Sequence, residues 1–324
     1  MRIVLCYPVE PRHVEQIATA APQAELVDAG QERIAQEIFS ADIFCGHAKV
    51  PLDWDGVVRA GRLRWIQSSA AGLDHCLVPS VVASDITITS ASGVLADQVS
   101  EHAMALVLAL TRSLPVFFRA QQAREFIRRP TRDLHGSTVG IVGFGGVGRR
   151  LAEVLAPFKT RILATDMFPV DRPDYVAELW PAERLDDLLR EVEIVFLCVP
   201  LTASTRGMVN AGRLAQLREG ALLINVARGP LVVEADLVNA LESGRLAGAG
   251  LDVTEEEPLP ATSKLWELPG VVITPHVGGQ SKRRIDQMTD FFCANLRRYL
   301  AGRPLANLVD KQLGFPPRIA AKSS

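Results

Sequence analysis

The stretch TVGIVGFGGVGRRLAEVLAPF (138–158) decides the fold class of this 324-residue chain. It begins with an apolar run that has the composition of a buried β-strand, and the run leads directly into Gly143, Gly145 and Gly148. From Val147 onward, apolar residues recur at helical spacing. A strand that turns through glycines into a helix is the opening unit of a doubly wound α/β domain.

The rest of the chain repeats this alternation of short apolar runs and helical patterns. The runs are apolar on both faces, as is typical of parallel strands covered by helices on both sides. They fall into two sets, which predict two sheets. The first set is 3–7, 43–47, 64–69 and 86–91, and the second is 138–145, 161–166, 194–200, 221–227, 247–253 and 271–277.

Helical patterns predict the domain organisation. One long apolar helix is expected from about Val99 to Arg119, between the two sets of strands, and the pattern at 284–300 is expected to return the chain to the first domain. We therefore expect a discontinuous first domain, 1–97 with 284–324, and a second domain, 98–283. Shorter helical patterns occur at 11–20 and 54–60.

Bulk composition excludes several classes of protein. With 48% hydrophobic and 22% charged residues and a net charge of −2, the chain is globular and lacks the basic tract that nucleic acid or an anionic membrane requires. The longest apolar stretch, 103–110, is far shorter than the roughly 20 residues of a membrane span. The five cysteines form no CxxC pair and are expected to be buried, reduced thiols. We expect a cytoplasmic protein.

The spacing of the three glycines indicates a dinucleotide site. Gly143 permits a tight turn, Gly145 lets a pyrophosphate approach the backbone, and Gly148 lets the helix pack on the strand. Free N–H groups at the start of the helix would then meet the charge of the diphosphate. The alternative is a glycine-rich turn without a ligand, since this motif by itself is a weak signal.

The next apolar run ends at Asp166. A carboxylate at this place accepts hydrogen bonds from the adenosine ribose diol and repels a 2′-phosphate. No arginine directly follows Asp166, which favours NAD, although Arg172 is near enough to leave NADP as the second choice. The alternative is an aspartate that only caps the next turn.

Three later strands end at side chains suited to oxidation of an alcohol beside a carboxylate. Arg228 follows the strand in LLINVARGP, Asp252 begins DVTEEEP, and His276 lies in VVITPHVGG. Ligands of doubly wound sheets bind at the carboxyl ends of the strands. Arginine holds a carboxylate or polarises a carbonyl, and histidine exchanges a proton near neutrality. A glutamate beside His276 would favour the imidazolium form.

Each of these residues also has a simpler interpretation: a surface arginine, a solvated run of glutamates and a structural histidine. Of the six histidines, however, only His276 combines a strand end with a glycine-rich turn. No set of His, Cys, Asp and Glu has the spacing of a metal site, and no nucleophile motif is present, so we expect no metal.

The ordered motifs GFGGVG, ATD, CVPLTASTRGMVN, NVARGPLVVEADL, GAGLDVTEEEP and TPHVGG resemble the D-isomer-specific 2-hydroxyacid dehydrogenase family, with the similarity running from about Arg64 to Asp310. The resemblance implies a Rossmann NAD-binding domain inserted in a flavodoxin-like substrate domain. It also implies an oxidoreductase that moves hydride between NAD(H) and a small D-2-hydroxy or 2-keto acid. A homodimer packed through the 99–119 helix is a further implication.

The resemblance implies roles for individual residues. Arg228 corresponds to the substrate-binding arginine, His276 to the acid/base, and Glu257, directly before Pro258, to the partner of that histidine. By the same resemblance His276 would also contact the substrate. Asp252 corresponds to a carboxylate that contacts the nicotinamide carboxamide.

Further residues take their roles from the same resemblance. Backbone N–H groups near Ala71 and Gly72, in SSAAGLDH, would hold the substrate carboxylate, and Val94 would line the nicotinamide pocket. The full set of expected cofactor-binding residues is Gly143, Gly145, Gly146, Val147, Gly148, Asp166, Pro200, Thr205, Ala227, Asp252 and Gln98.

Departures from the family pattern narrow the substrate. Gly146 stands where many members carry a basic or polar side chain, so only its backbone could contact the diphosphate. Cys45 lies near the place where phosphoglycerate dehydrogenases have an arginine, which weakens 3-phosphoglycerate as substrate. Glu257 argues against a formate dehydrogenase, which is expected to have glutamine there. An NADH-sensing protein like the family's corepressors remains the alternative function.

Overall fold

The computed structural model describes residues 1–317 of the chain. The chain divides into two compact units: Met1–Leu95 joins the described residues from Ser281 onward, and Ala96–Gln280 forms the second. The described residues form two parallel sheets, one of five strands and one of seven, and each belongs to one unit. The prediction of α/β architecture with two parallel sheets is confirmed.

The first unit has the strand order β2-β1-β3-β4-β5, with every neighbouring pair parallel. This is the flavodoxin-like order, and its topological switch lies between β1 and β3. The strands are β1 (Arg2–Cys6), β2 (Glu25–Asp28), β3 (Ile43–Gly46), β4 (Trp65–Ser68) and β5 (Thr87–Thr89).

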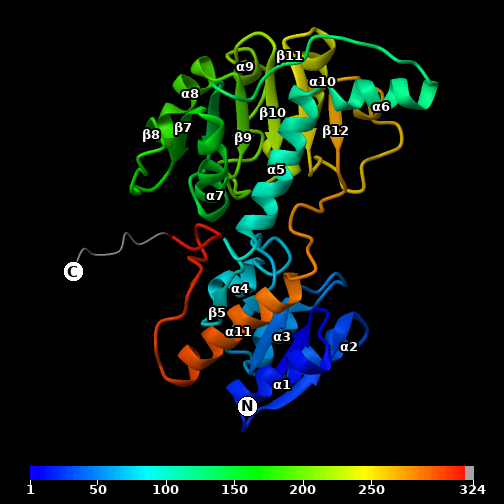
Figure 1. Cartoon of the computed structure of the whole chain (residues 1–324). Coiled ribbons are helices and arrows are strands. Elements are labelled where there is room, and N and C mark those ends of the chain that lie inside the picture. The colour runs from blue at the N-terminus through cyan, green and yellow to red at the C-terminus, as the bar shows by residue number, and fades with distance from the viewer. Residues whose placement is uncertain (318–324) are drawn as a thin grey trace. The chain divides into compact units, whose positions relative to one another are not determined.

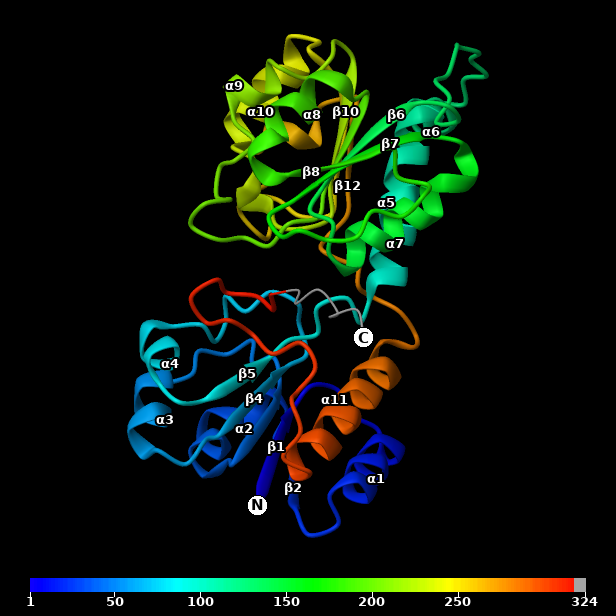
Figure 2. The ribbon, with the colours of Figure 1, turned by 90° about the vertical axis from the view of Figure 1, so that its left-hand side faces the viewer.

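Helices cover both faces of this sheet (Figure 2). On one face α1 (Pro11–Ala20) and α11 (Arg284–Leu300) bury Ile17 and Phe292. On the other face lie α2 (Gly30–Glu37), α3 (Trp54–Ala60) and α4 (Pro79–Ala83), with the short 3-10 helix Ile38–Ser40 after α2. The helices predicted at 11–20, 54–60 and 284–300 are confirmed to the residue.

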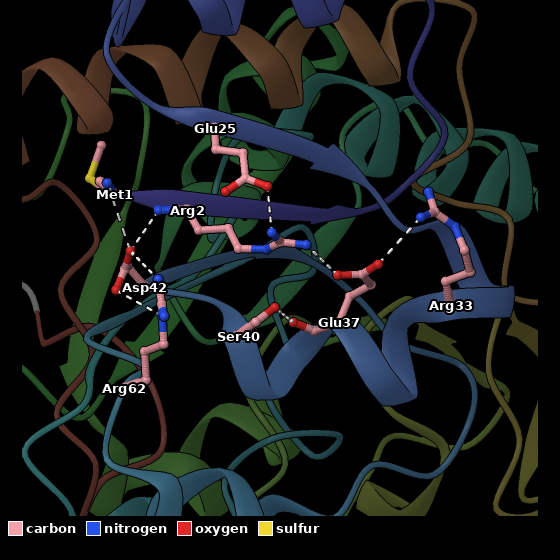
Figure 3. Close-up of polar contacts among 8 residues, drawn as sticks. All are labelled: Met1, Arg2, Glu25, Arg33, Glu37, Ser40, Asp42 and Arg62. Atoms are coloured by element: carbon pink, nitrogen blue, oxygen red, sulfur yellow. Dashed lines mark hydrogen bonds and ion pairs between the residues drawn. The ribbon is translucent and has the colours of Figure 1, made fainter.

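A network of charged residues lies at the amino-terminal ends of the strands of this sheet (Figure 3). The guanidinium of Arg2 contacts Glu25 and lies 2.6 Å from Oε2 of Glu37. Its backbone N–H donates to Asp42 (2.6 Å), which also contacts Arg62. These groups join β1, β2, α2 and the start of β3 at the edge opposite the carboxyl ends of the strands.

The second unit has the strand order β12-β11-β10-β9-β6-β7-β8, again parallel throughout. This is the Rossmann order with a seventh strand added, and the order reverses between β6 and β9. The strands are β6 (Thr138–Val142), β7 (Arg161–Asp166), β8 (Glu178–Pro181), β9 (Ile194–Leu197), β10 (Ala221–Asn225), β11 (Leu246–Leu251) and β12 (Val271–Ile273).

Two helical layers enclose this sheet (Figures 1 and 2). One contains α5 (Ala96–Thr111) and α7 (Gly146–Leu155) and buries Phe144 and Phe196. The other contains α8 (Leu185–Glu191), α9 (Ala211–Leu214) and α10 (Glu234–Glu242). The remaining helices are α6 (Leu114–Ala123) and the 3-10 helices Ala156–Phe158, Ala182–Arg184, Gly229–Leu231 and Lys264–Trp266.

The prediction of one helix from Val99 to Arg119 is wrong. The segment forms α5 and α6, which are bent by 65° at the break. Ser113 adopts a left-handed backbone (φ 56°), and Pro115 stands in the first turn of α6. Because proline lacks an N–H and its ring crowds the preceding turn, a continuous helix cannot pass this point.

The sequence also failed to reveal β2 and β8, since neither is a continuous apolar run. Both are edge strands of four residues, and their end residues are exposed. Exposed end residues are common in strands at the edge of a sheet. Four of the five free cysteines are buried, as predicted, and the prediction is wrong for Cys198, which is only half-buried directly after β9.

No single helix among the described residues is long and apolar enough to cross a membrane; only the bent pair of α5 and α6, taken together, meets that test.

Candidate active site

The glycine turn between β6 and α7 leaves room for a ligand beside the backbone. Gly143 has φ +94°, which side chains of L-residues rarely allow. A Cβ on Gly148 would lie 2.1 Å from the carbonyl oxygen of Gly143, so the close packing of helix on strand requires glycine. A Cβ on Gly145 would meet no atom within 4 Å. The space beside Gly145, at the start of α7, is therefore open, and binding of a pyrophosphate there stays a prediction.

Asp166 ends β7 and lies next to this turn. Its Oδ2 accepts from the N–H of Phe144 (2.7 Å), and its Oδ1 accepts from the N–H of Phe168 (2.9 Å). The carboxylate of Asp166 thus holds two turns in place: the glycine turn after β6 and the turn that follows β7. Each oxygen keeps a second lone pair, which leaves the predicted contact with a ribose diol feasible.

The other predicted cofactor residues of this unit occupy loops and helix starts. Gly146 and Val147 begin α7, and Thr205 closes the loop after β9 by donating from Oγ1 to the carbonyl of Pro200 (2.7 Å). Ala227 follows β10. Gln98 is buried in α5. Contacts of these residues with a cofactor stay predictions.

Arg228 stands in a turn that its neighbours hold tightly. The buried Asn225 donates from Nδ2 to the carbonyl of Arg228 (2.9 Å) and accepts from the N–H of Ala227 (3.1 Å). A Cβ on Gly229 would lie 1.7 Å from the carbonyl oxygen of Thr254. This contact packs the Arg228 turn against the segment that leads to Glu257, because β10 and β11 are neighbours (Figure 1).

Glu257 and His276 form a hydrogen-bonded pair. Nδ1 of His276 lies 2.9 Å from Oε2 of Glu257, and the other oxygen of Glu257 accepts from the N–H of Thr254 (3.3 Å). Both side chains are partly exposed, at 47% and 40%. With Nδ1 engaged by the carboxylate, Nε2 is the nitrogen left to exchange a proton with a substrate.

The three glutamates before Pro258 have distinct places. Oε2 of Glu255 accepts from the N–H of Glu234, the first residue of α10, which is a helix-capping role. Glu256 is exposed. Glu257 alone among them contacts His276 in the described structure.

Asp252 is buried (3% exposed) beneath the loop that carries His276. Its Oδ1 accepts from the N–H of Val277 (2.9 Å), and its Oδ2 accepts from the N–H of Gly278 (2.8 Å). Oδ1 also accepts from Oγ1 of Thr274 (2.7 Å) and lies 3.2 Å from Nε2 of His102. The observed contacts make Asp252 an anchor of the histidine loop, and its contact with a nicotinamide carboxamide stays a prediction.

The remaining candidates lie in the first unit. Ala71 and Gly72 follow β4 at the carboxyl edge of its sheet, in a loop where Ser68 Oγ accepts from the N–H of Ala70 (3.1 Å). Val94 precedes the boundary with the second unit. Their substrate and cofactor contacts stay predictions. Across residues 1–317, no group of three or more His, Cys, Asp and Glu residues could hold a metal ion.

Sequence reasoning missed three residues that shape this site: Asn225, Thr274 and His102. Asn225 and Thr274 stand at strand ends, close in sequence to Arg228 and His276. That position could have marked them as candidates for the site. His102 and Thr274 are 172 positions apart, so no local pattern could have paired them.

Comparisons with known proteins agree with this geometry. A family model described as "D-isomer specific 2-hydroxyacid dehydrogenase, NAD binding domain" matches residues 104–278. The glyoxylate reductase of Pyrococcus furiosus is 32% identical over 293 residues, which cover 87% of this chain and 86% of that protein.

Solved structures resemble the chain over nearly its whole length. A D-isomer specific 2-hydroxyacid dehydrogenase from Xanthobacter autotrophicus, in complex with NADPH and MES, has a TM-score of 0.83 and 30% identity, covering 97% of this chain and 99% of that one. An NADPH-dependent glyoxylate/hydroxypyruvate reductase from Sinorhizobium meliloti, in complex with NADP and sulfate, has a TM-score of 0.82 and 29% identity with the same coverage.

Proposed function

Because the chain belongs to the D-isomer specific 2-hydroxyacid dehydrogenase family, we propose that it transfers a hydride between NAD(H) and a small D-2-hydroxy or 2-keto acid. The observation that carries this proposal is the His276–Glu257 pair at the carboxyl ends of β11 and β12, in the same sheet as the glycine turn. Ligands of such sheets bind along this edge.

In this proposal the chain's own residues bind, orient and exchange protons. The bound dinucleotide supplies or accepts the hydride. The guanidinium of Arg228 holds the substrate carboxylate and polarises the carbonyl. In reduction, Nε2 of His276 gives its proton to the carbonyl oxygen. Glu257, bonded to Nδ1, stabilises the imidazolium form that donates this proton. In oxidation the same nitrogen takes the hydroxyl proton.

Glyoxylate and hydroxypyruvate are the first substrates to test, since similar proteins are named for them. We propose NAD(H) as the preferred cofactor, supported by Asp166 at the end of β7. The two similar structures contain NADPH or NADP, so both cofactors belong in the assay.

The test is a spectrophotometric screen at 340 nm with NADH and NADPH in parallel. The panel holds glyoxylate, hydroxypyruvate, pyruvate and bulkier 2-keto acids. Oxidation of NADH by at least one acid is the expected result. Tight binding of NADH with no turnover on any acid would instead favour the corepressor-like alternative.

We also propose a homodimer that involves α6 and the residues after it. Phe118 in α6 is 57% exposed, and Phe126 beyond it is 93% exposed. Exposed large apolar side chains such as these support an interaction site in this segment. Light scattering during gel filtration should give twice the chain mass, and Phe126→Asp should shift the protein toward the monomer.

A further inference from the structure

A partly buried polar network links α5 to the loop that carries His276. Nε2 of His102 lies 2.7 Å from Oγ1 of Thr274, and Oγ1 of Thr274 lies 2.7 Å from Oδ1 of Asp252. The same carboxylate receives the backbone N–H groups of Val277 and Gly278. The network therefore reaches the residues on both sides of His276.

The order of donors in this network follows from what each group can give. The carboxylate of Asp252 only accepts, so the hydroxyl proton of Thr274 points to it. The hydroxyl oxygen of Thr274 is then left to accept, and Nε2 of His102 must carry the proton that it donates. Nε2 of His102 also lies 3.2 Å from Oδ1 of Asp252, so His102 reaches the anchor of the loop both through Thr274 and directly.

The loop needs such an anchor because its backbone is strained. His276 has φ +54°, in the left-handed region that non-glycine residues avoid. Its N–H donates to the carbonyl of Asp252 (2.8 Å). Gly278 lets the loop approach closely, since a Cβ there would lie 2.8 Å from Oδ2 of Asp252 and 3.5 Å from the ring of His102.

From this geometry we infer that His102, acting through Thr274 and Asp252, is a positioning residue that holds His276 against Glu257. The inference rests on the proposed function, in which His276 is the acid/base. His102 itself touches no reacting atom. It keeps the loop in the left-handed turn that places Nδ1 of His276 beside the carboxylate.

Two pairs of variants separate loss of the network from loss of fold. His102→Leu and Thr274→Val remove the donor and the relay. His102→Gln keeps an N–H donor and Thr274→Ser keeps the hydroxyl, so each conservative change should restore most of the activity. His135→Leu, at an exposed histidine of the same unit, is the matched control. If the change at one of the two residues prevents folding, the two variants at the other residue still test the inference.

The kinetic readout is kcat for the best keto acid, together with the KM for NADH. We expect His102→Leu and Thr274→Val to lower kcat about tenfold or more, as loss of a hydrogen bond to a charged site does, with the KM for NADH little changed. In a His276→Gln background, His102→Leu should have no further effect on kcat, because both changes act through one group. Equal effects in both backgrounds would contradict the inference.

A second readout does not depend on activity. Histidine labelled with nitrogen-15 reports by NMR which ring nitrogens carry a proton and a hydrogen bond, and the His276→Gln spectrum identifies the signals of His276. In His102→Leu and Thr274→Val the Nδ1 signal of His276 should lose the shift that its hydrogen bond to Glu257 produces, because the ring leaves the carboxylate. An unchanged Nδ1 signal in both variants would overturn the inference. A wild-type protein that reduces no acid would overturn the proposed function alone, and the NMR result would still stand.

Discussion

Nδ1 of His276 lies 2.9 Å from Oε2 of Glu257, although the two residues are separated by 19 positions and follow different strands. The pair forms because β11 and β12 are adjacent and parallel, so that their carboxyl ends meet at one edge of the sheet. An imidazole oriented in this way by a carboxylate is suited to moving a proton on and off a substrate oxygen.

The first prediction concerns this pair. His276→Gln should lower kcat by about 10²–10⁴-fold, the usual contribution of a general acid or base. Glu257→Gln should also lower kcat, by less, because the imidazole remains. Steady-state rates with saturating NADH check both, and fluorescence titration with NADH should show binding intact. Glu256→Gln, at an exposed neighbour, is the control, and an equal loss there would contradict the assignment.

The second prediction compares two glycines of the same turn. Gly148→Ala should lower both the unfolding temperature and NADH affinity, because its Cβ would strike the carbonyl oxygen of Gly143. Gly145→Ala should leave the unfolding temperature nearly unchanged, because its Cβ meets no protein atom. It should still weaken NADH binding at least about tenfold, since the methyl group fills the space proposed for the pyrophosphate. Calorimetric titration measures the affinity for NADH. If Gly145→Ala binds NADH as tightly as the wild type does, the dinucleotide does not bind beside Gly145.

The third prediction concerns the choice of cofactor. Asp166→Ser should raise the ratio of kcat/KM for NADPH to that for NADH about tenfold or more, because it removes the charge that repels a 2′-phosphate. The ratio is the proper measure, since Asp166 also accepts hydrogen bonds from Phe144 and Phe168 and its loss destabilises the turn. A wild-type preference for NADPH would show that Asp166 serves only those turns.

The fourth prediction is a pH dependence of stability in the first unit. The hydrogen bond from His13, followed by the charge of Arg12, lowers the pKa of Asp286 below 3.8. A carboxyl whose pKa falls on folding stabilises the protein above its unfolded pKa, and that contribution is lost as pH falls through the folded value. Asp286→Asn should therefore lower the urea midpoint at pH 7.

The difference from wild type should narrow only below about pH 4, where Asp286 becomes protonated. Urea titrations in steps from pH 7 to pH 3 check this window. Asp290→Asn, one turn further along α11, is the matched control, because the carboxylate of Asp290 accepts a hydrogen bond from the uncharged amide of Gln16 (2.6 Å). A difference that shrinks already between pH 7 and pH 5 would contradict this assignment.

Local patterns in the sequence predicted the elements that local physics specifies. The strand and glycine turn at 138–148 could be predicted because the backbone conformation at Gly143 and the close packing at Gly148 both require glycine. The helix at 284–300 was legible because its apolar face repeats at helical spacing. The helix break at Ser113 was not predicted, although Pro115 stands two residues later, because the apolar pattern continues without interruption across this point.

Residues close together in the chain were enough to predict two parallel α/β sheets, the glycine turn and the strand-end positions of Arg228, Asp252 and His276. The family resemblance named Glu257 as the partner of His276. The folded chain was needed to show the contact of that pair, the anchoring of the histidine loop by Asp252 and the contact of His102 with Thr274. Those contacts depend on strand order and on the packing of α5 against β11 and β12. Such packing is a property of distant segments brought together, which no local spacing encodes.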